Sequence, residues 1–118
     1  MPSARFVKLV AESKSCIREI SADEASQQQA AGAVLIDVRE AEEFAKDHAA
    51  AALHLSRGVL ELKIEDAVPD INTPVICYCG GGSRSALAAE SLQKMGYTNV
   101  ASLAGGFKAW KEAGLATS

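Results

Sequence analysis

The length and charge of this chain exclude several classes of protein before any motif is considered. At 118 residues it is long enough for one domain with a real core and too short for two. A formal net charge of −3 argues against a nucleic-acid or general polyanion binder, so any anion site must be local. Three cysteines are too few for a disulfide scaffold, and their spacing predicts no metal site.

The hydropathy pattern predicts neither a secretion signal nor a membrane span, because charged residues interrupt each apolar run. We therefore expect a protein of the reducing cytoplasm that binds no membrane. Apolar positions in residues 3–13 predict a short helix. We interpret residues 1–15 as a helical extension and residues 16–118 as a single domain. The extension would cover a face of the sheet or form a dimer contact, and we expect a monomer or a weak homodimer.

The rest of the chain alternates between strand-like and helix-like segments. A capping box, in which Ser21 caps a helix and Glu24 reaches back to it, predicts where one helix begins. The predicted strands are residues 16–20, 34–38, 52–55, 75–78 and the last part of 97–103. The predicted helices after the extension are residues 22–31, 41–46, 59–64, 84–95 and 107–113. This alternation predicts an α/β fold, with a mostly parallel five-stranded sheet and helices on both faces.

One stretch, residues 75–85, combines the features of a reactive anion site. A short strand ends in Cys79, three glycines follow, and Arg84 opens a helix. Glycines allow successive backbone N–H groups to turn inward as a nest of donors for an anion. The same donors and the positive end of the helix favour the thiolate of Cys79 over its thiol. We predict a nucleophilic Cys79 in an anion cradle, with Arg84 as a second anion clamp or as a brace of the loop.

The alternative for Cys79 is a buried structural thiol beside a flexible glycine turn. Parallel sheets bind ligands at the carboxyl ends of their strands, where Cys79 falls, and this position favours a catalytic role. Cys77 is expected to be a core residue, with a resolving thiol as the alternative. Cys16, on the predicted edge strand, is expected to be structural or incidental.

Four segments in order resemble the signatures of the rhodanese-like (sulfurtransferase) domain family, over about residues 17–115. They are Asp37-Val38-Arg39-Glu40 with Glu43-Phe44, Asp47-His48 with Ala51-Ala52, Cys79-Gly80-Gly81-Gly82-Ser83-Arg84-Ser85, and Leu103-Ala104-Gly105-Gly106-Phe107-Lys108-Ala109-Trp110. Four positions depart from the family pattern: Asp47 replaces a glycine, Ala49 an isoleucine, and Ser56 and Ala116 common prolines. These positions shape loops rather than chemistry, so the resemblance implies a rhodanese-like fold.

The resemblance also implies an activity. The six residues from Cys79 to Arg84 form a loop of the sulfurtransferase length, one residue shorter than in the related phosphatases. Cys79 would accept a sulfane sulfur from thiosulfate or a persulfide donor and pass it to a thiol, cyanide or a protein thiol. The loop residues that would bind substrate are Gly80, Gly81, Gly82, Ser83, Arg84 and Ser85. No cofactor is implied.

Three further residues are expected to support the site: Asp37, Arg39 and His48. Asp37 and Arg39 are expected to tie loops together, with a general base as the alternative for Asp37. His48 is expected to cap a helix or brace a loop, and the alternatives are that it lines the mouth of the site or helps a proton to move. Two alternative functions are a sulfur relay that serves a partner protein and a regulatory interaction domain that has lost its chemistry. The retained Cys79 disfavours the second.

Overall fold

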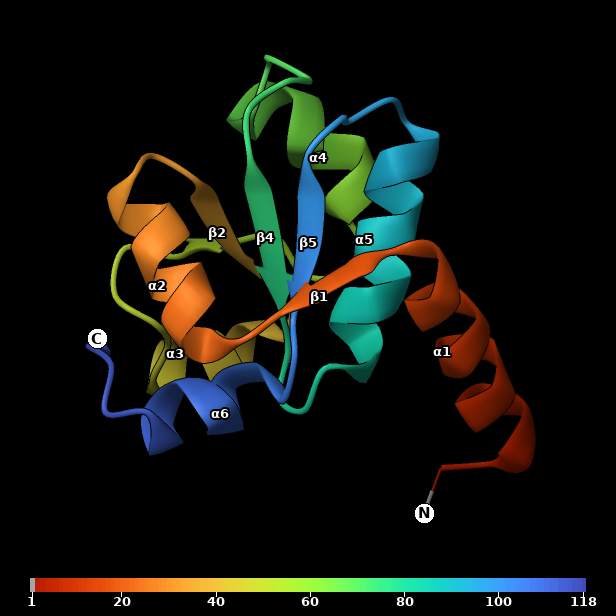
Figure 1. The fold of residues 1–118 in the computed structure, drawn as a ribbon, viewed down its shortest axis with the longest axis horizontal. Coiled ribbons are helices and arrows are strands. Elements are labelled where there is room, and N and C mark those ends of the chain that lie inside the picture. Colours follow the sequence, from red (N-terminus) through yellow and green to blue (C-terminus); the bar gives the residue numbers. More distant parts are fainter. Residues whose placement is uncertain (1) are drawn as a thin grey trace.

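A five-stranded parallel sheet lies at the centre of the fold in the computed structural model, which describes residues 2–118 (Figure 1). The strands are β1 (Arg18–Ile20), β2 (Val34–Asp37), β3 (Leu53–His54), β4 (Val75–Tyr78) and β5 (Val100–Leu103). Their spatial order is β1-β5-β4-β2-β3, and each neighbouring pair is parallel. The predicted fold class is confirmed. The described residues add one isolated antiparallel bridge, between Ala49 and Thr117.

Strand β4 occupies the middle of the sheet because neither of its faces is polar. All four of its residues are buried, as expected for a parallel strand covered on both sides. It pairs with β2 through Ile36 and Cys77, and with β5 through Cys77 and Ser102. The chain that leaves β4 therefore emerges at the centre of the carboxyl edge of the sheet.

Helices cover both faces of the sheet, as predicted. They are α1 (Ala4–Cys16), α2 (Ala22–Ala30), α3 (Ala41–Lys46), α4 (Leu60–Ala67), α5 (Ser83–Lys94) and α6 (Gly106–Glu112). One buried cluster joins α4 and α5 to the sheet and includes Ile64 and Leu92. A second cluster joins α2 and α6 to the opposite face and includes Phe107 and Trp110. No helix within residues 2–118 has both the length and the apolar character needed to cross a membrane.

Helix α1 packs on the outer side of α5 (Figure 1). Val10 and Ser13 are its buried residues, and the Ser13 hydroxyl donates a hydrogen bond to Glu90 Oε1 at 2.9 Å. These contacts extend the helix to Cys16, three residues beyond the predicted end. The prediction that Cys16 lies on an edge strand is therefore wrong, because only residues 18–20 pair with β5. Cys16 is exposed at the end of a helix.

The other boundaries either agree with the predictions or differ by a few residues. The capping box at Ser21 and Glu24 is present and starts α2 as predicted. Helix α4 runs to Ala67 instead of Ile64, because its helical hydrogen bonding continues to the amide of Val68. Strand β3 is only two residues long, since β2 is its sole partner in the described chain.

Candidate functional site

Cys79 stands directly after β4, where the carboxyl end of the central strand meets the start of α5. Its side chain is buried, with 1% of the residue exposed. The three glycines that follow lead into Ser83, the first residue of α5. The topology therefore places the predicted loop at a switch from strand to helix, a position at which α/β proteins commonly bind ligands.

Backbone amides of the loop turn toward the Cys79 sulfur. The amide of Gly82 donates to Cys79 Sγ at 3.1 Å, and the amide of Ser85 donates to it at 3.4 Å. Gly82 caps α5 with a φ of 103°, a left-handed conformation that residues with a Cβ rarely adopt. The glycine at this position lets the chain turn back over the sulfur, and the predicted nest of donors is present in the structure.

Two buried hydroxyl groups continue this network behind the sulfur. In its thiol form Cys79 donates to Ser85 Oγ at 3.5 Å, and Ser85 Oγ lies 2.8 Å from Ser102 Oγ. Ser102 belongs to β5, and its residue is fully buried. When Cys79 is a thiolate, Ser102 can donate to Ser85 while Ser85 donates to the sulfur. Ser102 was not predicted as a site residue, although a serine inside the otherwise apolar strand β5 was a signal.

These contacts determine the acidity of Cys79. Burial by itself raises the pKa of the thiol. The Ser85 hydroxyl and the amides of Ser85, Gly82 and Gly81 act in the opposite direction, and together they hold the pKa of Cys79 below its usual range. Hydrogen bonds to the charged form thus outweigh desolvation, so the site favours a reactive thiolate.

Helix α6 supports the same loop through its backbone amides. The amide of Phe107 donates to the Cys79 carbonyl at 2.7 Å, and the amide of Lys108 donates to the Gly80 carbonyl at 3.3 Å. Gly106 has a φ of 58°, and a methyl group there would collide with the Cys79 and Gly80 carbonyl groups. Gly106, the first residue of α6, is therefore required for the close approach of the helix to the loop.

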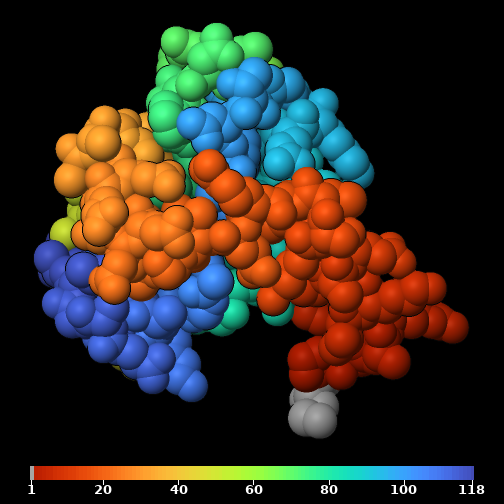
Figure 2. Space-filling model, in the orientation of Figure 1, coloured from red at the N-terminus to blue at the C-terminus, as the bar shows by residue number. Residues whose placement is uncertain are grey.

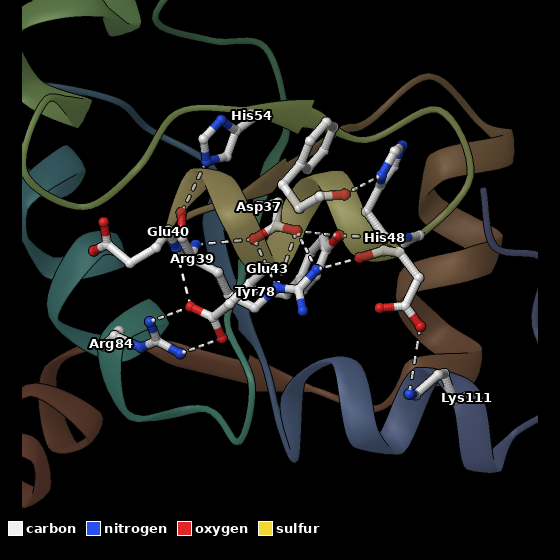
Figure 3. A network of polar contacts seen from close by, with 12 residues as sticks. Asp37, Arg39, Glu40, Glu43, His48, His54, Tyr78, Arg84 and Lys111 are labelled. Atoms are coloured by element: carbon white, nitrogen blue, oxygen red, sulfur yellow. Dashed lines mark hydrogen bonds and ion pairs between the residues drawn. The ribbon is translucent and has the colours of Figure 1, made fainter.

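Arg84 forms an ion pair with Glu43 at the mouth of the loop (Figure 3). Its Nη1 lies 3.1 Å from Glu43 Oε1, and its Nη2 lies 3.4 Å from Glu43 Oε2. Hydrogen bonding to Arg84 is the main cause that lowers the pKa of Glu43, and the same pairing raises the pKa of Arg84. Arg84 is thus paired with Glu43, a residue that was not expected at the site from the sequence.

Asp37 and Arg39 form a buried pair at the end of β2. The Asp37 carboxylate accepts hydrogen bonds from the Arg39 amide and guanidinium at 2.8 to 3.1 Å, and from the Tyr78 hydroxyl at 2.7 Å (Figure 3). Arg39 also donates to the Asp47 carbonyl at 2.7 Å, and its guanidinium lies over the Phe107 ring at 4.5 Å. The pair ties loops together, and the carboxylate has no free oxygen for a general base.

His48 is held by α3 instead of by the loop. Its Nδ1 lies 2.8 Å from the Phe44 carbonyl oxygen, and its ring stacks on the Phe44 ring at 3.7 Å. His54 stacks on the other side of Phe44, and its Nε2 lies 2.8 Å from the Arg39 carbonyl oxygen. His48 makes no hydrogen bond to residues 79–85 in the described chain. Across residues 2–118 no cluster of three or more potential ligand side chains could hold a metal ion.

The other two cysteines differ in their surroundings. Cys77 is fully buried in the core beneath α5, and burial raises its pKa to about 12. A thiol with that pKa is a poor nucleophile at neutral pH, which disfavours a resolving role. Cys16 is exposed at the end of α1, and all three cysteines are free.

A cavity of about 260 Å³ lies between the loop and α1. It is lined mainly by apolar residues of the N-terminal segment, together with one loop residue: Pro2, Phe6, Val7, Val10, Ala11, Lys14 and Ser83. Figure 2 shows a hollow on this side of the molecule, between α1 (red) and α6 (blue). The N-terminal helix therefore forms a wall next to the loop.

Comparisons with known proteins agree with this geometry. A sequence profile described as the rhodanese-like domain matches residues 21–113. A protein of unknown function from Rhodopseudomonas palustris, named as a possible tyrosine phosphatase, is 30% identical, with a TM-score of 0.88 over 100% of this chain and 99% of that chain. The polysulfide-sulfur transferase homodimer from Wolinella succinogenes is 29% identical, with a TM-score of 0.83 over 98% of this chain and 88% of that chain.

A larger enzyme also contains a similar fold. The thiosulfate sulfurtransferase from Pseudomonas aeruginosa is 34% identical, with a TM-score of 0.78 over 86% of this chain. This chain covers 20% of that protein, so the similarity concerns one part of it.

Proposed function

Because this chain belongs to the rhodanese-like domain family, we propose that it is a sulfurtransferase whose Cys79 carries sulfane sulfur as a persulfide. The observation that supports this most directly is the hydrogen bonding of the Cys79 sulfur. It accepts hydrogen bonds from the Gly82 and Ser85 amides and lies beside the Ser85 hydroxyl. These donors lower the pKa of Cys79 despite its burial. The same donors suit a terminal persulfide anion, because both forms carry negative charge on sulfur.

The proposed reaction has two displacement steps. The Cys79 thiolate attacks the outer sulfur of thiosulfate, the donor S–S bond breaks, and sulfite leaves with the bonding electron pair. Cys79 then carries the transferred sulfur as a persulfide. In the second step cyanide or an acceptor thiolate attacks that outer sulfur, and Cys79 departs as a thiolate. No redox partner is needed, because each step exchanges one bond to sulfur for another.

Two comparisons support sulfur as the transferred group. The relatives from Wolinella succinogenes and Pseudomonas aeruginosa are named as sulfur transferases. The loop of six residues from Cys79 to Arg84 is also of the length expected for sulfur transfer. Thiosulfate, a persulfide or a polysulfide is therefore the donor class that we propose.

The test is the mass of the intact protein before and after exposure to thiosulfate. We expect a gain of one sulfur atom, located on Cys79 by peptide mapping and absent from Cys79→Ser. Addition of cyanide should release thiocyanate and restore the starting mass. A protein that gains no sulfur from thiosulfate, an alkyl persulfide or polysulfide would contradict the proposal, as would equal labelling of Cys79→Ser.

Phosphatase activity is the main competing chemistry, because the Rhodopseudomonas palustris relative is named as a possible tyrosine phosphatase. We expect no phosphate release from an aryl phosphate. Release that is abolished in Cys79→Ser would replace the sulfurtransferase proposal with a phosphatase.

A relay to a protein thiol is the alternative form of the same chemistry. It predicts slow turnover with cyanide and small thiols, and faster turnover with one acceptor protein. Equal rates with cyanide and with every acceptor protein tested would contradict a dedicated relay.

A second copy of the chain is the partner that we propose for the outer side of α1. The relative from Wolinella succinogenes is named as a homodimer and aligns with 98% of this chain. Leu9 of α1 is 50% exposed and is not among the residues that line the cavity next to the loop. Sedimentation velocity should show a dimer that Leu9→Ser weakens, and a monomer at all concentrations would contradict it.

A further inference from the structure

We propose that Glu43 determines which sulfur donors the site prefers, by neutralising Arg84 so that doubly charged oxyanions bind less well than singly charged or neutral donors. This inference rests on the proposed sulfurtransferase function, but it concerns a charge that can be tested separately. Glu43 lies in α3, far from the loop in sequence, and is brought to Arg84 only by the fold.

The guanidinium of Arg84 lies next to Gly80 of the loop. A methyl group built on Gly80 would be 3.5 Å from Arg84 Nη2, so the cation adjoins the first glycine after Cys79. This is the position from which an arginine would bind the oxygens of an incoming donor. In the structure both terminal nitrogens point instead to the Glu43 carboxylate (Figure 3).

The Glu43 carboxylate is itself held in place from α3. Its Oε1 accepts a hydrogen bond from the Glu40 amide at 3.1 Å, which forms part of the capping box of this helix. The carboxylate is therefore fixed by its own helix on one side and by Arg84 on the other. A donor oxyanion would have to displace a preorganised carboxylate in order to use Arg84.

The charged groups that act most on Arg84 are all negative. Arg84 is paired with Glu43, Glu40 adds a negative charge nearby, and the Cys79 thiolate adds another. The other arginine of this region, Arg39, is paired with Asp37 in the interior. Thiosulfate carries two negative charges and an alkyl persulfide one, so the penalty should be larger for thiosulfate.

The decisive variant is Glu43→Gln, which removes the charge and keeps the size of the side chain. We expect the KM for thiosulfate to fall roughly threefold to tenfold, the scale of one half-exposed charge acting on a dianion. The KM for an alkyl persulfide should fall less. Glu42→Gln is the matched control, because Glu42 lies on the same helix, makes the same charge change and does not pair with Arg84. Glu43→Asp shortens the side chain but keeps the charge, so its KM for thiosulfate should fall less than that of Glu43→Gln.

A second readout needs no sulfur transfer. In a Cys16→Ser background, alkylation of Cys79 is followed by mass spectrometry with anionic iodoacetate and with neutral iodoacetamide. The thiolate displaces iodide in both cases, so the ratio of the two rates reports the local charge. Glu43→Gln should raise the iodoacetate to iodoacetamide ratio roughly twofold to fivefold, and Glu42→Gln should leave it nearly unchanged.

The outcomes separate the two proposals. If Cys79 accepts no sulfur from any donor, the proposed function fails, while the alkylation ratio still decides the role of Glu43. Equal ratios in Glu43→Gln and Glu42→Gln would overturn the inference, as would a Glu43→Asp variant that behaves like Glu43→Gln. If Glu43→Gln does not fold, the alkylation ratio of the wild type tests the inference instead. Its ratio should rise with ionic strength because salt screens the repulsion of iodoacetate, and a falling ratio would overturn the inference.

Discussion

Two arginine–carboxylate pairs lie near the Cys79 loop, and they differ mainly in their exposure to water. The Asp37 and Arg39 side chains are 0% and 6% exposed, and the carboxylate is also bonded to Tyr78. The Arg84 and Glu43 side chains are 36% and 39% exposed, and they meet at the mouth of the loop. Each pair joins an arginine to an acid of the same short region, residues 37–43, yet the two pairs should contribute differently to the stability of the protein.

The difference follows from what happens when each pair is broken. Removal of Arg39 would leave a charge in the interior without a counterion, which is far more costly than the loss of a surface pair. The groups of the Glu43–Arg84 pair can be solvated as they separate, so that pair is free to exchange partners. The buried pair therefore acts as a frame, by which we mean a fixed set of contacts that holds the loops in place. The exposed pair is suited to separate when a ligand binds.

Replacement of Arg39 by Met should have the largest effect of the substitutions considered. We expect a loss of roughly 3 to 5 kcal/mol in the free energy of unfolding, because the Asp37 carboxylate would be buried without its cation. Urea titration measures it. A loss below that of Arg84→Met would contradict the contrast between the two pairs.

Replacement of Tyr78 by Phe tests the neutral hydroxyl that donates to the Asp37 carboxylate in the same frame. The variant removes the hydrogen bond to Asp37 and leaves the Ala49 amide without its acceptor. We expect a loss of about 1.5 to 3 kcal/mol in the free energy of unfolding. Tyr97→Phe is the control, since the Tyr97 hydroxyl donates only to the neutral Val68 carbonyl, and it should cost less. A larger loss in Tyr97→Phe would contradict this expectation.

Replacement of Ser85 by Ala tests a third charge near the loop, the Cys79 thiolate. Neutral hydrogen-bond donors stabilise this charge, whereas an arginine stabilises each of the two carboxylates. The Ser85 hydroxyl lowers the pKa of Cys79, so its removal should raise that pKa. Because the thiolate is the reactive form, the midpoint of the pH profile of iodoacetamide alkylation should move to higher pH. Ser102→Ala should move it in the same direction by less, since Ser102 acts through Ser85. An unchanged or lower midpoint in Ser85→Ala would be inconsistent with this network.

Replacement of Arg84 by Met should have the smallest effect on stability. The pair with Glu43 is more than one-third exposed on both sides, so we expect a loss of at most about 1 kcal/mol by urea titration. Combination with Glu43→Gln should add little, because either change already breaks the pair. A loss comparable with that of Arg39→Met would show that this pair is also part of the frame.

Much of the fold was predictable because its signals are local. The capping box at Ser21 and Glu24, the apolar run of β4 and the three glycines after Cys79 each specify their own segment. The exceptions were the ends of elements. Cys16 was assigned to a strand because residues 16–20 alternate, but contacts of α1 with α5 extend the helix through it.

The loop from Cys79 to Ser85 was evident from the sequence alone, since glycine is the residue that permits its turns and cysteine is a residue type that can supply a nucleophile. Only the tertiary structure could reveal Ser102 behind the sulfur and Glu43 on Arg84. These partners come from strands and helices distant in the chain, and their contacts depend on packing, which no local pattern records. Residue type and spacing thus determined the chemistry available to this protein. Burial in the tertiary structure decided which arginine–carboxylate pair holds the loops in place and which pair can exchange partners.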